Sequence, residues 1–249
     1  MQCGRATRLL ALGLTGFALL AAAQAPDSIV VGAFSSAVPG GAMPEGWEPL
    51  IFPRIGRHTT YTLVRDGKAG VVVRAEADAS ASGLSHKLDL PAVEWTRLSW
   101  RWKVERAITG SDVTRREGDD YPARIYVSFR YSPERLSPRE RLRYAAARLL
   151  HGEYPPHASL NYIWYPKAPI GTTIANPFTD RVRMIVVENG NANLGRWLEY
   201  ERDIAADYRA AFGEEPPPIA GVAIMTDADD TGESAVAYYG DIVLRKRRQ

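Results

Sequence analysis

Carboxylates crowded into "MTDADDTGES", residues 225–234, are the side chains of this sequence best suited to chemistry. Asp227, Asp229 and Thr231 follow an apolar run in the order of a D-x-D-x-T phosphoryl-transfer motif, in which the first aspartate is the nucleophile. That motif belongs on the first strand of a doubly wound sheet, and only 18 residues follow Thr231. The position in the chain therefore excludes phosphoryl transfer through these aspartates.

Two interpretations of the same segment remain, a cation site and a tight turn. An EF-hand loop needs a bidentate glutamate at its twelfth position, where Tyr238 stands, and it needs flanking helices that this segment lacks. A simpler site built from the oxygens of Asp227, Asp229 and Asp230 would favour calcium over zinc, because no thiol or paired imidazole is nearby. Aspartate and threonine side chains also cap turns. We predict a turn that could also hold a structural calcium ion.

Charged and aromatic residues also recur on segments that are predicted to be strands. Charges on a strand need partners or water, because an isolated buried charge is costly. They form either structural ion pairs, such as Arg124 with Asp120, or a groove for a polar ligand. Carboxylates such as Asp120 and Glu188 could also form the acid and base of a glycan-cleaving hydrolase or lyase. The candidate ligand-binding residues are Arg101, Lys103, Asp119, Asp120, Arg124, Tyr126, Asn161, Trp164 and Glu188.

The elements that must position these residues are mostly short strands. Nine segments are rich in β-branched and aromatic residues, and several alternate with period two. In "LSWRWKV" (98–104), for example, Leu98, Trp100, Trp102 and Val104 share one face. Strands without a βαβ rhythm predict an all-β sandwich or barrel. The segments are 59–64, 70–77, 84–90, 96–104, 123–131, 159–165, 181–188, 219–226 and 235–244.

Two short helices are expected to interrupt the strands. The first begins at Ser137 as N-cap, with Pro138 at its first position and Glu140 completing a capping box. The second begins near Asp203 and ends at Gly213. The first helix either contacts an anionic surface or packs on the sandwich through its apolar stripe, and we favour packing. Its stripe is Leu142, Ala145, Ala146 and Leu149, and its basic residues are Arg139, Arg141, Arg143 and Arg148.

The N-terminus has the organisation of a secretory signal. Arg5 and Arg8 precede the apolar run 9–20, and small residues then predict cleavage after Ala23. The expected products are a signal peptide, residues 1–23, and one domain, residues 24–249, in the periplasm or outside a bacterial cell. No transmembrane segment is expected after signal removal.

Composition narrows the function of the mature chain further. The single cysteine would leave with the signal peptide, so thiol catalysis and disulfides are excluded. Removing Arg5 and Arg8 lowers Lys+Arg from 31 to 29, which equals the 29 Asp+Glu. A balanced charge argues against nucleic acid as a partner. We expect a monomer, without a certain cofactor.

Several segments together resemble one family, the bacterial domain of unknown function 3047. They are "LSWRWKV", "GDDYPARIYVSF", "NYIWY", "MIVVENGNANLGRWLEYERDIAADYRAAFGEEPPP" and "GVAIMTDADDTGESAVAYYGDIVL". The likeness covers nearly the whole mature chain. It implies a secreted bacterial domain, and it transfers no activity.

The opening "GAFSSAVPGGAMPEGWEPL" and the closing "GDIVLRKR" resemble jelly-roll carbohydrate-binding modules of the galactose-binding type. This likeness implies a jelly-roll β-sandwich and adds Asp241 to Asp227, Asp229 and Asp230 as a calcium ligand. Such modules stack sugar rings on aromatic side chains and bind hydroxyls with planar polar groups. We therefore expect a non-catalytic protein that binds a glycan or another polar envelope ligand, with glycan cleavage as the alternative.

Overall fold

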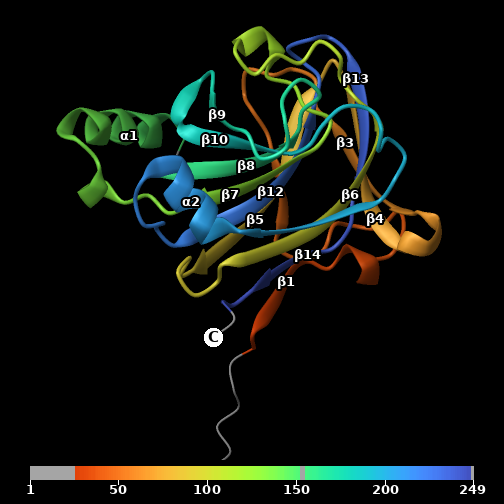
Figure 1. Ribbon diagram of the computed structural model, residues 1–249, viewed down its shortest axis with the longest axis horizontal. Helices are drawn as coiled ribbons and strands as arrows, with labels where there is room; N and C mark the ends of the chain where they lie inside the picture. Colours follow the sequence, from red (N-terminus) through yellow and green to blue (C-terminus); the bar gives the residue numbers. More distant parts are fainter. Residues whose placement is uncertain (1–25, 152–154, 248–249) are drawn as a thin grey trace, which may run out of the picture.

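The structure is a computed structural model that describes residues 26–151 and 155–247 (Figure 1). The predicted signal peptide, residues 1–23, lies outside the described residues. Fourteen strands form two seven-stranded sheets, called sheet A and sheet B here. Within the described residues, no helix is both long enough and apolar enough to cross a lipid bilayer.

Sheet A has the strand order β1–β14–β6–β13–β4–β3, and β11 also pairs with β6. All of its pairings are antiparallel. Its strands are β1 (Ser28–Gly32), β3 (Thr60–Arg65), β4 (Val71–Asp78), β6 (Arg97–Arg106), β11 (Leu198–Asp203), β13 (Ser234–Tyr239) and β14 (Ile242–Arg245).

Sheet B has the strand order β2–β5–β12–β7–β8–β10–β9, and only β8 and β10 pair in parallel. The chain crosses repeatedly between the two sheets, as in a jelly-roll β-sandwich, so the predicted fold class is confirmed. Its strands are β2 (Trp47–Leu50), β5 (Ala81–Leu90), β7 (Arg124–Phe129), β8 (Ala158–Trp164), β9 (Thr173–Asn176), β10 (Thr179–Glu188) and β12 (Ile219–Asp227).

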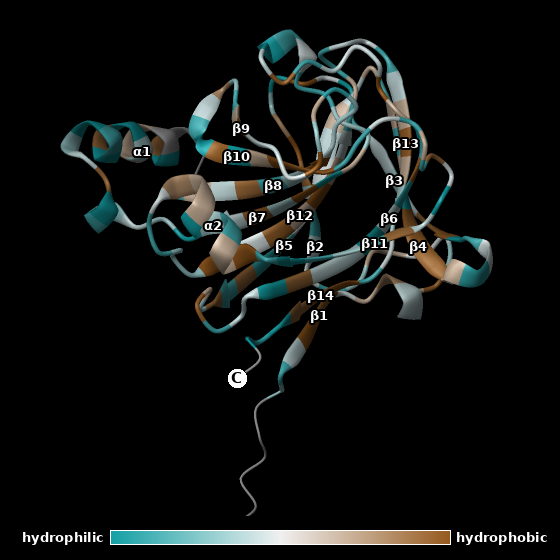
Figure 2. Cartoon of the chain, viewed as in Figure 1, coloured by the Kyte–Doolittle hydropathy of each residue, from teal (hydrophilic) through white to brown (hydrophobic). Residues whose placement is uncertain are grey.

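The strands differ from the prediction in two ways. Four of them, β1, β2, β9 and β11, lie outside the nine predicted segments, and one predicted segment near the C-terminus is divided. The segment 235–244 forms two strands, β13 and β14, which separate at Gly240 and Asp241. A Cβ atom at position 240 would lie 2.4 Å from Nε of Arg101, so the chain passes this side chain without one. In Figure 2 the hydrophobic colour is concentrated on the strands, whereas α1 is mostly hydrophilic.

Both predicted helices form, and the predicted end of the first, Gly152, lies outside the described residues. Helix α1 (Pro138–His151) begins with the expected capping box, because the Ser137 backbone N–H donates to the Glu140 carboxylate over 2.8 Å. Helix α2 (Ile204–Phe212) begins with Asp203, which accepts from the Ala206 N–H over 2.9 Å, and ends at Gly213 in the left-handed region.

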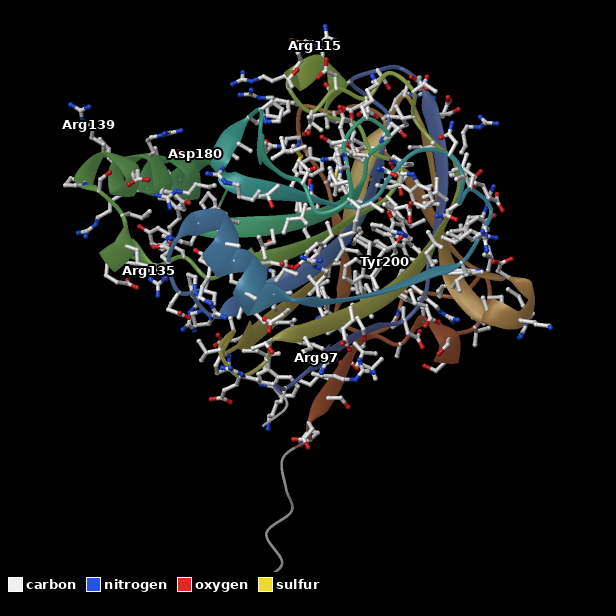
Figure 3. All side chains as sticks on the ribbon, in the orientation of Figure 1. Arg97, Arg115, Arg135, Arg139, Asp180 and Tyr200 are labelled. Carbon is white, nitrogen blue, oxygen red and sulfur yellow. The ribbon has the colours of Figure 1, made fainter. Side chains whose placement is uncertain are left out.

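The packing of α1 is the reverse of the expected one. Leu142 and Leu149 of the apolar stripe are 72% and 89% exposed. The helix instead contacts the rest of the protein through Glu140, which pairs with Arg181 of β10, and through Tyr144, whose ring stacks on Tyr131 at 4.9 Å. Figure 3 shows α1 beside β9 and β10, with Arg139 projecting away from the strands.

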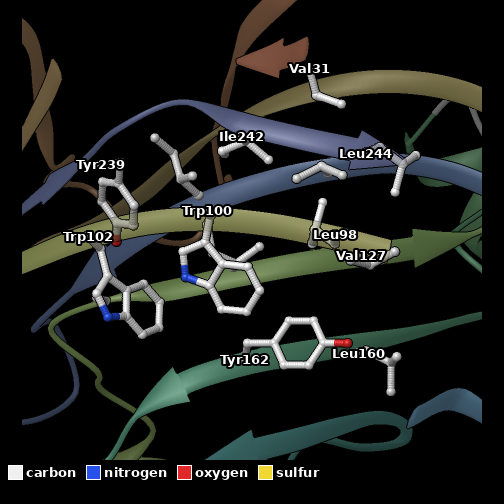
Figure 4. Packing of buried hydrophobic residues seen from close by; sticks show 14 of the residues in the cluster. Val31, Leu98, Trp100, Trp102, Val127, Leu160, Tyr162, Tyr239, Ile242 and Leu244 are labelled. Carbon is white, nitrogen blue, oxygen red and sulfur yellow. The ribbon is translucent and has the colours of Figure 1, made fainter. Parts of the chain in front are cut away.

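The main hydrophobic core lies between the two sheets (Figure 4). The predicted inward face of β6 is buried there, since Leu98, Trp100, Trp102 and Val104 are at most 3% exposed. The ring of Trp100 lies 5.1 Å from that of Tyr162 on β8, so aromatic contacts join the two sheets. Residues that alternate with this core therefore point to the outer face of each sheet.

Candidate functional site

Strand register places three rows of side chains on the outer face of sheet B. These residues alternate with Ile125, Val127 and Tyr162, which belong to the core between the sheets. Antiparallel partners that lie directly opposite each other share a face, so each row continues from strand to strand. From β12 through β7 to β8, the rows are Met225, Arg124 and Ile163; Ala223, Tyr126 and Asn161; and Gly221, Ser128 and Ser159.

A groove of about 480 Å³ lies over the second and third of these rows. Its floor includes Tyr126 and Ser128, and Gly221 contributes no side chain that would fill it. Apolar and aromatic groups beside the floor come from Leu50, Phe52 and Tyr131, and positive charge comes from Lys87 and Arg130. Arg130 also pairs with Asp89 over 2.8 Å at the exposed end of the groove.

Asn161 is an unusual buried group at the side of this floor. Its side chain is fully buried, and neither its amide nitrogen nor its amide oxygen has a hydrogen bond of standard geometry. Burial raises the pKa of the Tyr126 phenol, which lies opposite Asn161 across the strands, and the nearby Asn161 amide acts against that rise. A buried amide without full hydrogen bonds costs free energy. Asn161 therefore has bonding capacity to spare beside the groove.

Arg124, the β7 residue of the first row, lies under a loop and not in open solvent. Its side chain is 2% exposed, and its guanidinium binds both carboxylate oxygens of Asp227, with Nε donating to Oδ1 over 2.8 Å. Other donors bind the backbone carbonyl of Asp119 and, over 3.0 Å, the hydroxyl of Tyr126. The ring of Tyr121 covers the guanidinium at 4.3 Å. Burial alone would lower the pKa of Arg124, but the anionic groups around it raise that pKa overall.

The aspartate-rich segment "MTDADDTGES" contains a turn between β12 and β13, and Asp120 stabilises this turn. Asp120 is fully buried, and its carboxylate accepts from the backbone N–H groups of Asp230, over 3.3 Å, and Thr231, over 2.6 Å. Gly232 has a φ of +69°, which glycine adopts without strain. Asp120 therefore stabilises the turn, and Arg124 pairs with Asp227 and not with Asp120.

Three carboxylates beside this turn could hold a cation. Ligand oxygens of Asp120, Asp229 and Asp230 all lie within 4.8 Å of one another. Burial, together with the charges of Asp229 and Asp120, raises the pKa of Asp230 from 3.8 to about 6. Burial and the charge of Asp120 also raise the pKa of Asp229. Mutual repulsion of this kind is what a bound divalent cation would relieve.

The two other expected cation ligands are engaged elsewhere. Asp227 is 2% exposed and forms the ion pair with Arg124 described above. Asp241 accepts from the backbone N–H of Ser35 over 2.8 Å and from its hydroxyl over 2.5 Å. It therefore joins the segment after β1 to the segment before β14, and it does not belong to the Asp120, Asp229 and Asp230 cluster.

The remaining predicted ligand residues fall into separate places. Arg101 and Lys103 lie on the outer face of sheet A, where Lys103 pairs with Asp66 over 2.8 Å. Trp164 is fully buried, and its indole N–H donates to the Gly190 carbonyl. Asp119 belongs with Arg124, because its carboxylate lies 3.6 Å from Nη1 of Arg124 and also accepts from the side chain of Asn176. Only Tyr126 of the predicted ligand set lines the groove itself.

The two carboxylates considered for catalysis, Asp120 and Glu188, each accept hydrogen bonds from other parts of the protein. Asp120 accepts from the turn at residues 230–231, as described. Glu188 accepts from the Tyr200 hydroxyl over 2.9 Å and from the backbone N–H of Asn189 over 3.0 Å. Neither contact places the two carboxylates on opposite sides of a common cavity, which glycan cleavage requires.

Several groove residues were missed by reasoning from the sequence. Ser128 and Arg130 share the alternating face of Tyr126, and that alternation was a usable signal. Phe52 lies in the segment after β2, and Tyr131 follows β7, where no periodicity marks a binding role. Lys87 reaches the groove only because β5 pairs with β12 in the observed register.

Comparison with known proteins gives a family and a distant structural likeness. The profile of the family described as "Protein of unknown function (DUF3047)" matches residues 45–243. No curated protein matches the chain. Among solved structures, it is similar to the family 11 carbohydrate-binding module of the cellulosomal cellulase Lic26A-Cel5E of Clostridium thermocellum, with 10% identity, a TM-score of 0.44, and coverage of 91% of this chain and 98% of that one.

A second similar structure is the xyloglucanase domain of NopAA, a type three effector from Sinorhizobium fredii. It has 10% identity and a TM-score of 0.43, with coverage of 88% of this chain and 98% of that one. Both likenesses are distant and concern the arrangement of strands, so no activity is taken from either.

Proposed function

This chain belongs to the DUF3047 family, whose description assigns no activity, and we propose that it is an exported, non-catalytic β-sandwich that binds a glycan or a similar polar ligand. Export rests on the predicted signal peptide, residues 1–23. Binding rests on the groove over sheet B. The proposed ligand site consists of Phe52, Lys87, Tyr126, Ser128, Arg130 and Tyr131.

The groove carries this proposal because it combines the two kinds of group that recognise sugars. Phe52 offers an aromatic face on which the C–H groups of a sugar ring can stack, and the ring of Tyr131, which is stacked on Tyr144, adds a wall of the groove. Lys87, Ser128 and Arg130 offer hydrogen-bond donors for hydroxyl or acidic groups. A volume of about 480 Å³ lies within the range of small-ligand sites, and rigid strands hold its floor.

A bound calcium ion is a separate part of the proposal. Asp120, Asp229 and Asp230 supply hard oxygen ligands, and backbone carbonyls and water could complete the six to eight ligands that calcium takes. The role we propose for the ion is structural, because it would fix the turn before β13. Asp227 and Asp241 are left out of the proposed ligand set, since each has its own partner.

Binding is tested with an array of bacterial envelope and plant polysaccharides, followed by calorimetry on the glycans that are retained. The variant Phe52→Ala should lower affinity about tenfold, as expected for a central aromatic contact. The matched control is Trp197→Ala, which removes an aromatic side chain on the outer face of sheet A, beside Lys103. The folded protein failing to bind any glycan, or equal losses in the two variants, would contradict the proposed site.

A further inference from the structure

Helix α1 presents an apolar strip to solvent, with arginines on both of its sides. Leu142, Ala146 and Leu149 are spaced i, i+4 and i+7, so they lie on one helix face. All three are exposed, with Leu142 at 72% and Leu149 at 89%. Helical geometry places Arg139 and Arg143 on one side of the strip, and Arg141 and Arg148 on the other.

The opposite face of α1 is fixed to the sandwich, so the strip cannot turn inward. Glu140 pairs with Arg181, and the single hydrogen of the Tyr144 hydroxyl is shared between two backbone carbonyls, of Pro156 at 2.9 Å and His157 at 3.0 Å. Tyr144 also stacks on Tyr131. Glu140 is the only acidic residue of α1, and it points to this fixed face. The exposed face therefore carries apolar and positive groups alone.

We infer that this face of α1 binds the surface of an anionic lipid bilayer. A bilayer offers an apolar layer for the two leucines and negative headgroups for the arginines on both sides of them. Arginine stems can lie along the apolar layer while their guanidinium groups stay at the headgroups. The helix has 14 residues, a length of about 21 Å, which is too short to span the hydrocarbon core. It would lie in the plane of the interface.

The inference is tested by sedimentation of the chain with lipid vesicles. Residues 24–249 are used, because the apolar run at 9–20 would bind vesicles by itself. One set of vesicles contains phosphatidylcholine alone, and the other contains equal parts phosphatidylcholine and phosphatidylglycerol. We expect the protein to sediment with the anionic vesicles and to remain in solution with the neutral ones.

Variants then locate the contact on α1. Arg139→Gln with Arg143→Gln should lower the partition coefficient about fivefold for each arginine, or about 25-fold for the pair. The control pair, Arg65→Gln with Lys68→Gln, removes two exposed charges at the end of β3 and should leave binding unchanged. Leu142→Ser with Leu149→Ser should also weaken binding, whereas a purely electrostatic contact would tolerate it. Melting temperatures should be unaffected, because all these side chains are exposed.

Four results with vesicles would overturn the inference. The first two are no sedimentation with anionic vesicles and equal sedimentation with both kinds of vesicle. The third is an equal loss of binding in the α1 arginine pair and in the control pair of Arg65 and Lys68. The fourth is unchanged binding in the variant of Leu142 and Leu149. Retention of a short duplex DNA in place of the vesicles would assign the face to nucleic acid, and would also overturn it.

Discussion

The buried pair between Arg124 and Asp227 should be one of the most sensitive points of this sandwich. In Asp227→Asn the guanidinium would stay buried, with its two oxygen acceptors replaced by one oxygen and one amide donor. Both side chains are at most 3% exposed, so water cannot compensate. Removing one partner of such a pair costs about 3–5 kcal/mol of unfolding free energy. For a chain of this size, that is a fall in melting temperature of about 6–20 °C.

The structure supplies a matched control for this substitution. Arg57 and Asp78 form a pair of the same chemistry over 2.7 Å, but their side chains are 63% and 78% exposed. Asp78→Asn should therefore cost no more than about 1 kcal/mol. Guanidinium chloride unfolding, followed by tryptophan fluorescence, measures both variants against the unchanged chain.

A triple replacement tests the reason for the loss. Arg124→Met with Asp227→Leu and Asp119→Asn removes all three charges of the cluster, because the Asp119 carboxylate also lies 3.6 Å from Nη1 of Arg124, so this variant should recover part of the stability that Asp227→Asn loses. If Asp227→Asn and Asp78→Asn lose equal stability, or if the triple variant is less stable than Asp227→Asn, burial of an unpaired charge is not the cause and the reasoning is refuted.

Two further predictions concern the carboxylates of the turn. Calcium in hundredfold excess over its dissociation constant should add about 2.7 kcal/mol and raise the melting temperature by about 5–10 °C relative to EDTA; Asp230→Asn should reduce this gain, and Asp241→Asn should not. Identical melting curves in calcium and EDTA would exclude the ion. In EDTA, the folded state binds the Asp230 proton more tightly than the unfolded state, because burial and nearby charges raise its pKa from 3.8 to about 6. The stabilisation from this proton is complete below pH 3.8 and is lost as the pH rises to 6. The free energy of unfolding should therefore fall by about 1–2 kcal/mol between these two pH values, after allowance for solvent screening of a partly exposed group. Urea unfolding at several pH values measures the slope, and a slope that persists in Asp230→Asn would assign it to another group.

Much of the fold could be predicted because buried strand faces and helix caps produce residue patterns within a few neighbouring positions. The alternation in "LSWRWKV" identified the buried face of β6, and the capping box identified the start of α1. No such pattern marks the split between β13 and β14, because apolar residues continue on both sides of Gly240 and Asp241.

The site was harder to predict because its contacts join distant parts of the chain. The partner of Arg124 is 103 positions away, and Asp120 meets Thr231 across 111 positions. Residue type alone could not distinguish Asp227, which forms an ion pair, from Asp229 and Asp230, which stay beside Asp120. The apolar stripe of α1 was misassigned because amphipathic spacing does not say which face meets the protein.

The place of β12 and β13 in the sheets has a consequence for how the protein is made. Strand β12 lies between β5 and β7 in sheet B, and β13 lies between β4 and β6 in sheet A. Both come from residues 219–239, so each sheet stays divided until this late part of the chain has been synthesised. Pairing β12 and β13 with strands from much earlier in the chain closes long loops, and such pairings form slowly. Neither sheet can therefore be completed before residues 219–239 have been synthesised.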